Sequence, residues 1–242
     1  MLRTQYVACA MRSRALAVLL GAGLVVLLGA GWQAMAQEAK ALYPNMAPVD
    51  QYLMADRNEE IALARSAGPE SVSRDAEVMV LGRHGYESAV HGKNGFVCFV
   101  ERSWMSPTDD ADFWNPKLRG PLCVNAAAAR TYLPRTIKRT ELILAGRTKA
   151  QMIEAMTGAI DSKELPAMEP GAMCYMLSKQ GYLNSHAGHW HPHLMFFVSQ
   201  APPETWGANQ PGVPILALDD KEGHLTTFLV PVGKWSDGTV DE

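Results

Sequence analysis

The sequence predicts an α+β fold in which helices are inserted between the strands of an antiparallel sheet. Short apolar runs joined by glycine-bearing turns occupy residues 77–102, and this pattern is typical of a three-strand meander. Two helical stretches then separate the meander from a group of C-terminal strands. A doubly wound parallel sheet would need regular alternation of strands and helices, which this chain does not show.

The N-terminal segment has the features of a secretory signal peptide. Three arginines precede an apolar run over residues 15–32, and the small residues Ala34 and Ala36 form an A-x-A cleavage site. The sequence therefore predicts a signal peptide over 1–36 and an exported protein, periplasmic or secreted. The apolar run is long for a signal, so an uncleaved anchor is the alternative. That anchor would be the chain's one contact with a membrane.

Charge and length limit the remaining possibilities. The chain has 22 basic and 25 acidic side chains, and loss of the three signal-peptide arginines leaves 19 basic against 25 acidic. Nucleic-acid binding depends on clustered positive charge, so this balance argues against a nucleic-acid partner. We expect an entry segment and N-terminal helix over 37–70, followed by a single α+β domain over 71–242.

The elements are predicted in order from their local patterns. Asp50 is expected to cap a helix that reaches residue 64. Strands are expected at 77–81, 86–90 and 96–102. Helices are expected at 136–145 and after Thr148, whose spacing to Gln151 fits a capping box. The C-terminal strands are expected at 172–177 and 194–198, followed by a hairpin formed from 213–218 and 225–230.

The segment 104–123 is rich in Pro, Asp, Asn and Gly, and a loop of this length is usually functional or mobile. One interpretation is a lid or a carboxylate donor to the histidine site, because the segment holds Asp109, Asp110 and Asp112. The other, which we favour, is a surface loop held in place by Trp104 and the aromatic residues that follow it.

Three cysteines remain after removal of the signal peptide: Cys98, Cys123 and Cys174. Disulfides persist in the oxidising compartments that exported proteins enter, so one pair and one free thiol are expected. Cys98 and Cys123 flank the long loop and form the favoured pair, and Cys98 with Cys174 is the alternative. Cys174 lies in an apolar strand, which favours an inert thiol over a nucleophile.

Four of the seven histidines lie within eight residues, at His186, His189, His191 and His193. Imidazole is the commonest metal-ligating side chain, so the cluster suggests a zinc site. Alternate residues of an extended chain share a face, which makes His189 and His191 the leading ligands. We expect both in a loop, with His193 near the start of the next strand. The alternative is a structural loop anchored by Trp190.

A resemblance extends over much of the chain without naming an activity. Residues 171–197, from Gly-Ala-Met-Cys-Tyr-Met-Leu to His-Pro-His-Leu-Met-Phe-Phe, resemble a group of exported bacterial proteins of unknown function, as do residues 94–104. The resemblance implies export and supplies no site residues. The His-x-His pair is similar to cupin metal sites, but the expected Glu is missing and the helices do not suit a jelly roll.

Two functional interpretations follow from these patterns. The first is an exported binding or structural module of unknown ligand, with a histidine cluster that binds metal. The second is a zinc-dependent hydrolase of the cell envelope, in which an open position on the metal holds water. We prefer the first because no general base is identifiable. Glu87 and Glu101 are carboxylates in predicted strands and are expected to face solvent.

Overall fold

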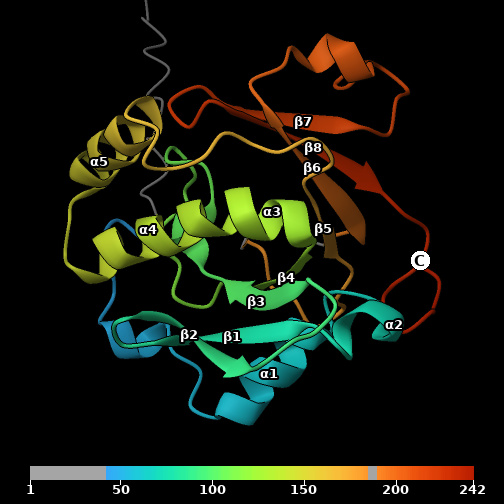
Figure 1. The fold of residues 1–242 in the computed structure, drawn as a ribbon, viewed down its shortest axis with the longest axis horizontal. Coiled ribbons are helices and arrows are strands. Elements are labelled where there is room, and N and C mark those ends of the chain that lie inside the picture. The colour runs from blue at the N-terminus through green and yellow to red at the C-terminus, as the bar shows by residue number, and fades with distance from the viewer. Residues whose placement is uncertain (1–41, 185–189) are drawn as a thin grey trace, which may run out of the picture. The chain divides into compact units, whose positions relative to one another are not determined.

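The computed structural model describes residues 42–184 and 190–242. The predicted signal peptide, His186 and His189 lie outside these residues. Residues Ala39–Glu242 group into one compact unit, which contains the sheet and the helices on both of its faces (Figure 1). Among the described helices, none combines the length and the hydropathy needed to cross a bilayer.

The predicted α+β class is confirmed, and its sheet is mostly antiparallel. Eight described strands form one sheet in the order β2-β1-β3-β4-β5-β6-β8-β7. They are β1 (Glu77–Gly82), β2 (Gly85–Val90), β3 (Val97–Glu101), β4 (Gly120–Val124), β5 (Met173–Met176), β6 (His193–Ser199), β7 (Leu216–Asp220) and β8 (Leu225–Pro231). The predicted C-terminal hairpin is present as β7 and β8, which pair antiparallel.

The predicted three-strand meander is wrong in one respect. β1 and β2 form the expected hairpin, but β3 pairs with β1 in parallel and β2 is left at the edge. The chain after β2 turns back past the start of β1, where the Glu77 amide donates to the Phe96 carbonyl at 2.9 Å. Burial explains this order, because every residue of β3 is buried while β2 is partly exposed. A strand that is apolar on both faces belongs in the interior of a sheet.

Helices cover both faces of the sheet (Figure 1). The described helices are α1 (Arg57–Arg65), α2 (Glu70–Ser73), α3 (Ala126–Thr131), α4 (Leu133–Leu144) and α5 (Lys149–Asp161), with 3-10 turns η1 (Val49–Gln51), η2 (Ser103–Met105) and η3 (Pro203–Trp206). α1 packs on β1, β3 and β4, and α3 and α4 pack on the other face. The α5 capping box of Thr148 and Gln151 is confirmed.

The first helix begins later than predicted. Asp50 lies in η1, and α1 is capped by Asp56, whose Oδ1 accepts from the Asn58 amide at 2.7 Å. Both aspartates can cap a helix, and the sequence alone did not separate them. The capping carboxylate satisfies an amide that the first turn leaves without an intrahelical partner.

Alternation along β3 separates the core into two layers. Val97 and Phe99 pack beneath α3 and α4, while Cys98 and Val100 pack against α1. The predicted Cys98–Cys123 disulfide lies in the α1 layer and joins directly opposed residues of β3 and β4. Cys174 is buried in the other layer as a free thiol. The alternative pair of Cys98 with Cys174 is therefore wrong, because the two residues face opposite sides of the sheet.

A buried ion pair fixes α1 to the sheet. Arg102 and Glu60 have side chains that are 0% and 2% exposed, and Arg102 Nη2 lies 2.8 Å from Glu60 Oε1. Arg102 also donates to the carbonyls of Tyr52 and Val100, and the Leu81 amide donates to Glu60. These partners satisfy groups that would otherwise be costly to bury.

The favoured interpretation of the segment 104–123, a loop held by its aromatic residues, is confirmed up to Gly120, where β4 begins. No contact of the described residues tests its interpretation as a lid or a carboxylate donor to the histidine site. Trp104 and Phe113 are almost fully buried, as expected of aromatic residues that hold a loop in place. The Trp104 indole donates to Thr140 Oγ1 of α4 at 3.0 Å. The part of the segment between these aromatics lines a cavity with Pro107, Thr108 and Asp109.

Candidate functional site

The described part of the histidine cluster places His191 and His193 in different surroundings. β6 begins at His193, as predicted, and this side chain is only 9% exposed. Its Nδ1 lies 2.8 Å from the His191 carbonyl oxygen, and burial lowers the pKa of the imidazole. The His191 side chain is 60% exposed, and its Nδ1 lies 2.6 Å from Asp241 Oδ2. The two rings therefore do not share one environment.

Trp190 anchors the start of this segment. Its Nε1 donates to the Gly181 carbonyl at 3.2 Å, and its ring meets Trp235 edge to face at 5.1 Å between centroids. Gly181 permits this approach, because a Cβ there would lie 2.9 Å from the Trp190 ring. The two tryptophans line a cavity of about 540 Å³ beside the C-terminal residues. Anchoring by Trp190 was the structural alternative for the cluster.

The predicted four-histidine zinc site is not tested by these contacts. Residues 42–184 and 190–242 contain no group of three or more side chains placed to hold a metal ion. His186 and His189 lie outside the described residues, so their convergence with His191 stays a prediction. What the structure adds is Asp241, a carboxylate partner for His191 that the sequence did not indicate.

A second cavity, of about 500 Å³, lies far from the histidines in the sequence. We call it the helix–hairpin cavity, because α4, α5, the β7–β8 hairpin and residues 105–109 enclose it. Its apolar lining includes Met105, Met152, Ile153, Met156, Ile160, Leu218 and Leu225. Its polar lining includes Arg135, Arg139, Thr157 and four carboxylates, Asp109, Asp219, Asp220 and Glu222.

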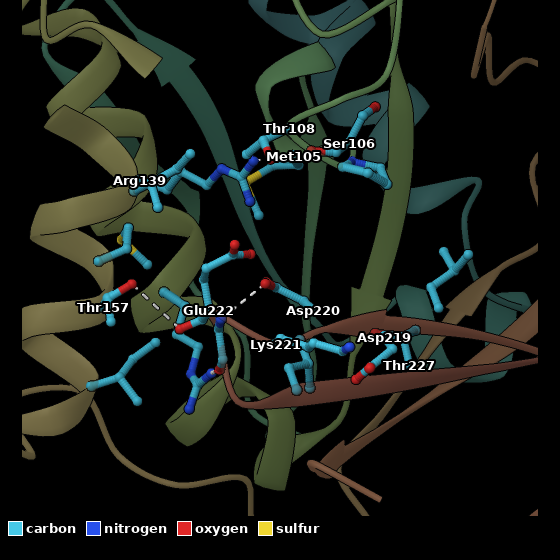
Figure 2. A pocket seen from close by; sticks show the side chains of 18 of the residues that line it. Met105, Ser106, Thr108, Arg139, Thr157, Asp219, Asp220, Lys221, Glu222 and Thr227 are labelled. Atoms are coloured by element: carbon cyan, nitrogen blue, oxygen red, sulfur yellow. Dashed lines mark hydrogen bonds between the residues drawn. The ribbon is translucent and has the colours of Figure 1, made fainter. Parts of the chain in front are cut away.

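Two arginines of α4 line this cavity. Arg135 and Arg139 are four residues apart, so they lie on one face of the helix. Arg135 is 6% exposed and donates to the carbonyls of Gly223 and Pro166, while Arg139 Nη2 donates to the Ser106 carbonyl at 3.0 Å. Burial lowers the pKa of both guanidinium groups. Figure 2 shows Arg139 beside Met105 and Ser106, across the space from the hairpin.

A buried carboxyl lies behind the cavity wall. Tyr132, which lines the cavity, donates from its hydroxyl to Glu101 Oε1 at 2.8 Å. Burial raises the pKa of Glu101 to about 7, and the Tyr132 hydrogen bond and the Arg139 charge partly oppose that rise. The prediction that Glu101 faces solvent is wrong, because β3 is interior and Glu101 lies on the side of Val97 and Phe99. The other candidate, Glu87, is exposed as predicted.

The helix–hairpin cavity was not predicted from the sequence, although most of α4 and α5 was. The α5 methionine Met152 is 1% exposed and lines the cavity. Arginines four residues apart on an otherwise amphipathic helix were the available signal. These arginines form part of a cavity only because the β7–β8 hairpin closes it. The hairpin lies far along the chain, since Arg135 and its partner Gly223 are 88 residues apart.

Comparisons with protein-family models, with curated proteins and with solved structures found no match to this chain. The resemblance to exported bacterial proteins therefore stays a prediction. The function is therefore inferred from the residues and geometry of the site.

Proposed function

We propose that this chain is an exported binding module whose small-molecule ligand occupies the helix–hairpin cavity. The observation that carries the proposal is a cavity of about 500 Å³ whose wall is apolar along α5 and polar along α4. Ligand sites generally have volumes of about 300–1,000 Å³ and combine an apolar lining with a few placed polar groups. The Cys98–Cys123 disulfide fits export, because such bonds persist in oxidising compartments.

A neutral fluorescent probe tests the cavity without reference to any charged group. N-phenyl-1-naphthylamine gains fluorescence in apolar sites, and we expect saturable binding to the full mature chain with one probe per molecule. Met156→Trp places a larger side chain in the cavity and should abolish this signal. Leu42→Trp adds the same ring at a site that is 64% exposed in the wild type and should leave binding unchanged. Equal binding by all three proteins would place the probe elsewhere.

A second candidate function is zinc binding at the histidine cluster, favoured by the contact between His191 and Asp241. Metal-ligating histidines usually hold their other ring nitrogen on a carboxylate or carbonyl, which fixes the ring for the metal. We propose His189 and His191 as the principal ligands, with His186 or His193 completing the set. With one position left to water, the same centre would be the zinc hydrolase alternative.

Zinc titration calorimetry tests this second candidate. Replacing His189 and His191 together with Ala should abolish stoichiometric zinc uptake, and Asp241→Asn should weaken it by about 10–100-fold through loss of the carboxylate partner. Affinity should fall below about pH 6, because protonated imidazole cannot ligate. His84→Ala, at an exposed and distant position, serves as the control. Unchanged uptake by the double variant would exclude these ligands.

A further inference from the structure

The two arginines in the helix–hairpin cavity lack the salt bridges that three other cations of the described residues make. Arg130 pairs with Glu169 at 2.6 Å, Lys138 of α4 pairs with Glu164 at 2.7 Å, and the buried Arg102 pairs with Glu60. Across the described ranges 42–184 and 190–242, Arg135 and Arg139 have hydrogen bonds to carbonyls but no salt bridge. The charges of Asp220 and Glu101 act on Arg139 from beyond salt-bridge distance. A ligand anion in direct contact would add charged hydrogen bonds that these carboxylates do not supply.

Arg139 has donor capacity left. Within the described residues its guanidinium hydrogen bond uses Nη2, which leaves Nη1, and its Nε is buried without a hydrogen-bond partner. The Phe113 ring lies 5.6 Å from its Cζ and helps to fix the planar group. A fixed guanidinium with unused donors is suited to a carboxylate, which accepts two parallel hydrogen bonds. Arg135 instead uses Nη1 on the carbonyl of Gly223, which lines the cavity, and Nη2 on the carbonyl of Pro166, so it acts as a positioning residue.

The charges that line the cavity limit the charge that a ligand can carry. The exposed lining holds one cation, Lys221, and four carboxylates, Asp109, Asp219, Asp220 and Glu222. Of the two arginines, Arg135 is buried and Arg139 is half-buried. Figure 2 shows Asp219, Asp220 and Glu222 on the hairpin side of the cavity. A polyphosphate would carry several negative charges past this acidic rim, whereas a single carboxylate carries one. The apolar side chains of α5 offer a surface for a hydrocarbon chain beside the charged group.

We propose that Arg139 binds the carboxylate of a monoanionic amphipathic ligand whose apolar chain lies along Met152, Ile153 and Met156. This inference rests on the proposed function, because it assigns the ligand class of the same cavity. It also explains why Arg139 makes no salt bridge within the described residues, although the charges of Asp220 and Glu101 act on it: the ligand supplies the direct anionic contact.

Displacement of N-phenyl-1-naphthylamine by three eight-carbon compounds tests the ligand class. At about pH 7.5, octanoate is anionic, 1-octanol is neutral and octylamine is cationic. We expect octanoate to displace the probe at concentrations about tenfold or more below those of 1-octanol, because the charged hydrogen bonds add to the same apolar contact. Octylamine should be the weakest. Equal potency of octanoate and 1-octanol, or tightest binding of octylamine, would overturn the proposal.

Variants of Arg139 test whether this side chain causes the preference for octanoate over 1-octanol. Arg139→Met should remove the advantage of octanoate over 1-octanol while leaving probe binding in place, and Arg139→Lys should restore part of it. Arg147→Met removes an exposed arginine beyond the end of α4 and should change nothing. If Arg139→Met does not fold, the octanoate preference of the wild type and its partial loss in Arg139→Lys still test the proposal. Probe binding without an octanoate preference rejects only the ligand class, whereas absence of probe binding rejects the proposed function as well.

Discussion

Replacing Arg102 with Met is expected to lower the free energy of unfolding by about 3–5 kcal/mol, because it breaks a buried ion pair and leaves one charge without its partner. Glu60 would stay 2% exposed with no cation beside it. The same change removes the hydrogen bonds that Arg102 donates to Tyr52 and Val100. Together these contacts join α1, β3 and the segment before α1.

Urea denaturation with the disulfide intact measures the effect of Arg102→Met. Arg102→Lys should lose less stability than Arg102→Met, because lysine keeps the positive charge. It should still be less stable than the wild type, because lysine lacks the planar set of donors. Arg74→Met is the matched control: Arg74 pairs with Glu70 at 2.7 Å, but both side chains are more than 60% exposed. Exposed pairs contribute about 0–1 kcal/mol, so this variant should stay near the wild type. Similar losses for Arg102→Met and Arg74→Met would contradict the role assigned to the buried pair.

Glu101→Gln is expected to remove most of a stability loss that the wild type shows as pH rises from 5 to 8. The pKa of Glu101 is raised to about 7 in the folded protein from an ordinary 4.5, so the folded state holds this proton more tightly than the unfolded state. Stability is therefore greatest below the unfolded pKa and declines as pH rises through the folded pKa. The decline attributable to this group is at most about 3 kcal/mol, because each pKa unit corresponds to about 1.36 kcal/mol.

The amide of Glu101→Gln can still accept the Tyr132 hydrogen bond through its oxygen, so the variant removes the titration while preserving that contact. We expect the variant to be more stable than the wild type at pH 8 and similar to it at pH 5. Glu154→Gln, on the exposed side of α5, should follow the wild-type profile. Parallel profiles for wild type and Glu101→Gln would show that this carboxyl does not control the pH dependence.

Local patterns predicted the parts of the fold that depend on neighbouring residues. The capping box at Thr148, the β7–β8 hairpin and the strand that begins at His193 each follow from a few adjacent side chains. The Cys98–Cys123 disulfide was also predicted, although its stated reason was loop closure. The structure adds that the two residues are directly opposed on neighbouring strands.

Contacts between elements that are far apart in the sequence could not be predicted from it. The placement of β3 beside β1 buries Glu101 and moves β2 to the edge. The glycine-bearing turns predicted a meander, and the continuous apolar run of β3 was the signal for an interior strand. The helix–hairpin cavity likewise needs α4, α5 and a hairpin from the end of the chain. His191 and His193 are near neighbours in sequence but lie in different environments. Convergence of the four histidines on one metal ion stays a prediction.

The position of a bound probe tests most directly whether the helix–hairpin cavity is a ligand site. Methyl-labelled methionine allows NMR to report on each methionine during titration with N-phenyl-1-naphthylamine, whose rings shift nearby methyl resonances. We expect large shifts for Met105, Met152 and Met156, which line the helix–hairpin cavity, and no shift for Met54, which packs against the α1 layer of the core. Saturable shifts confined to other methionines, or no shifts at probe saturation, would contradict a ligand site in this cavity.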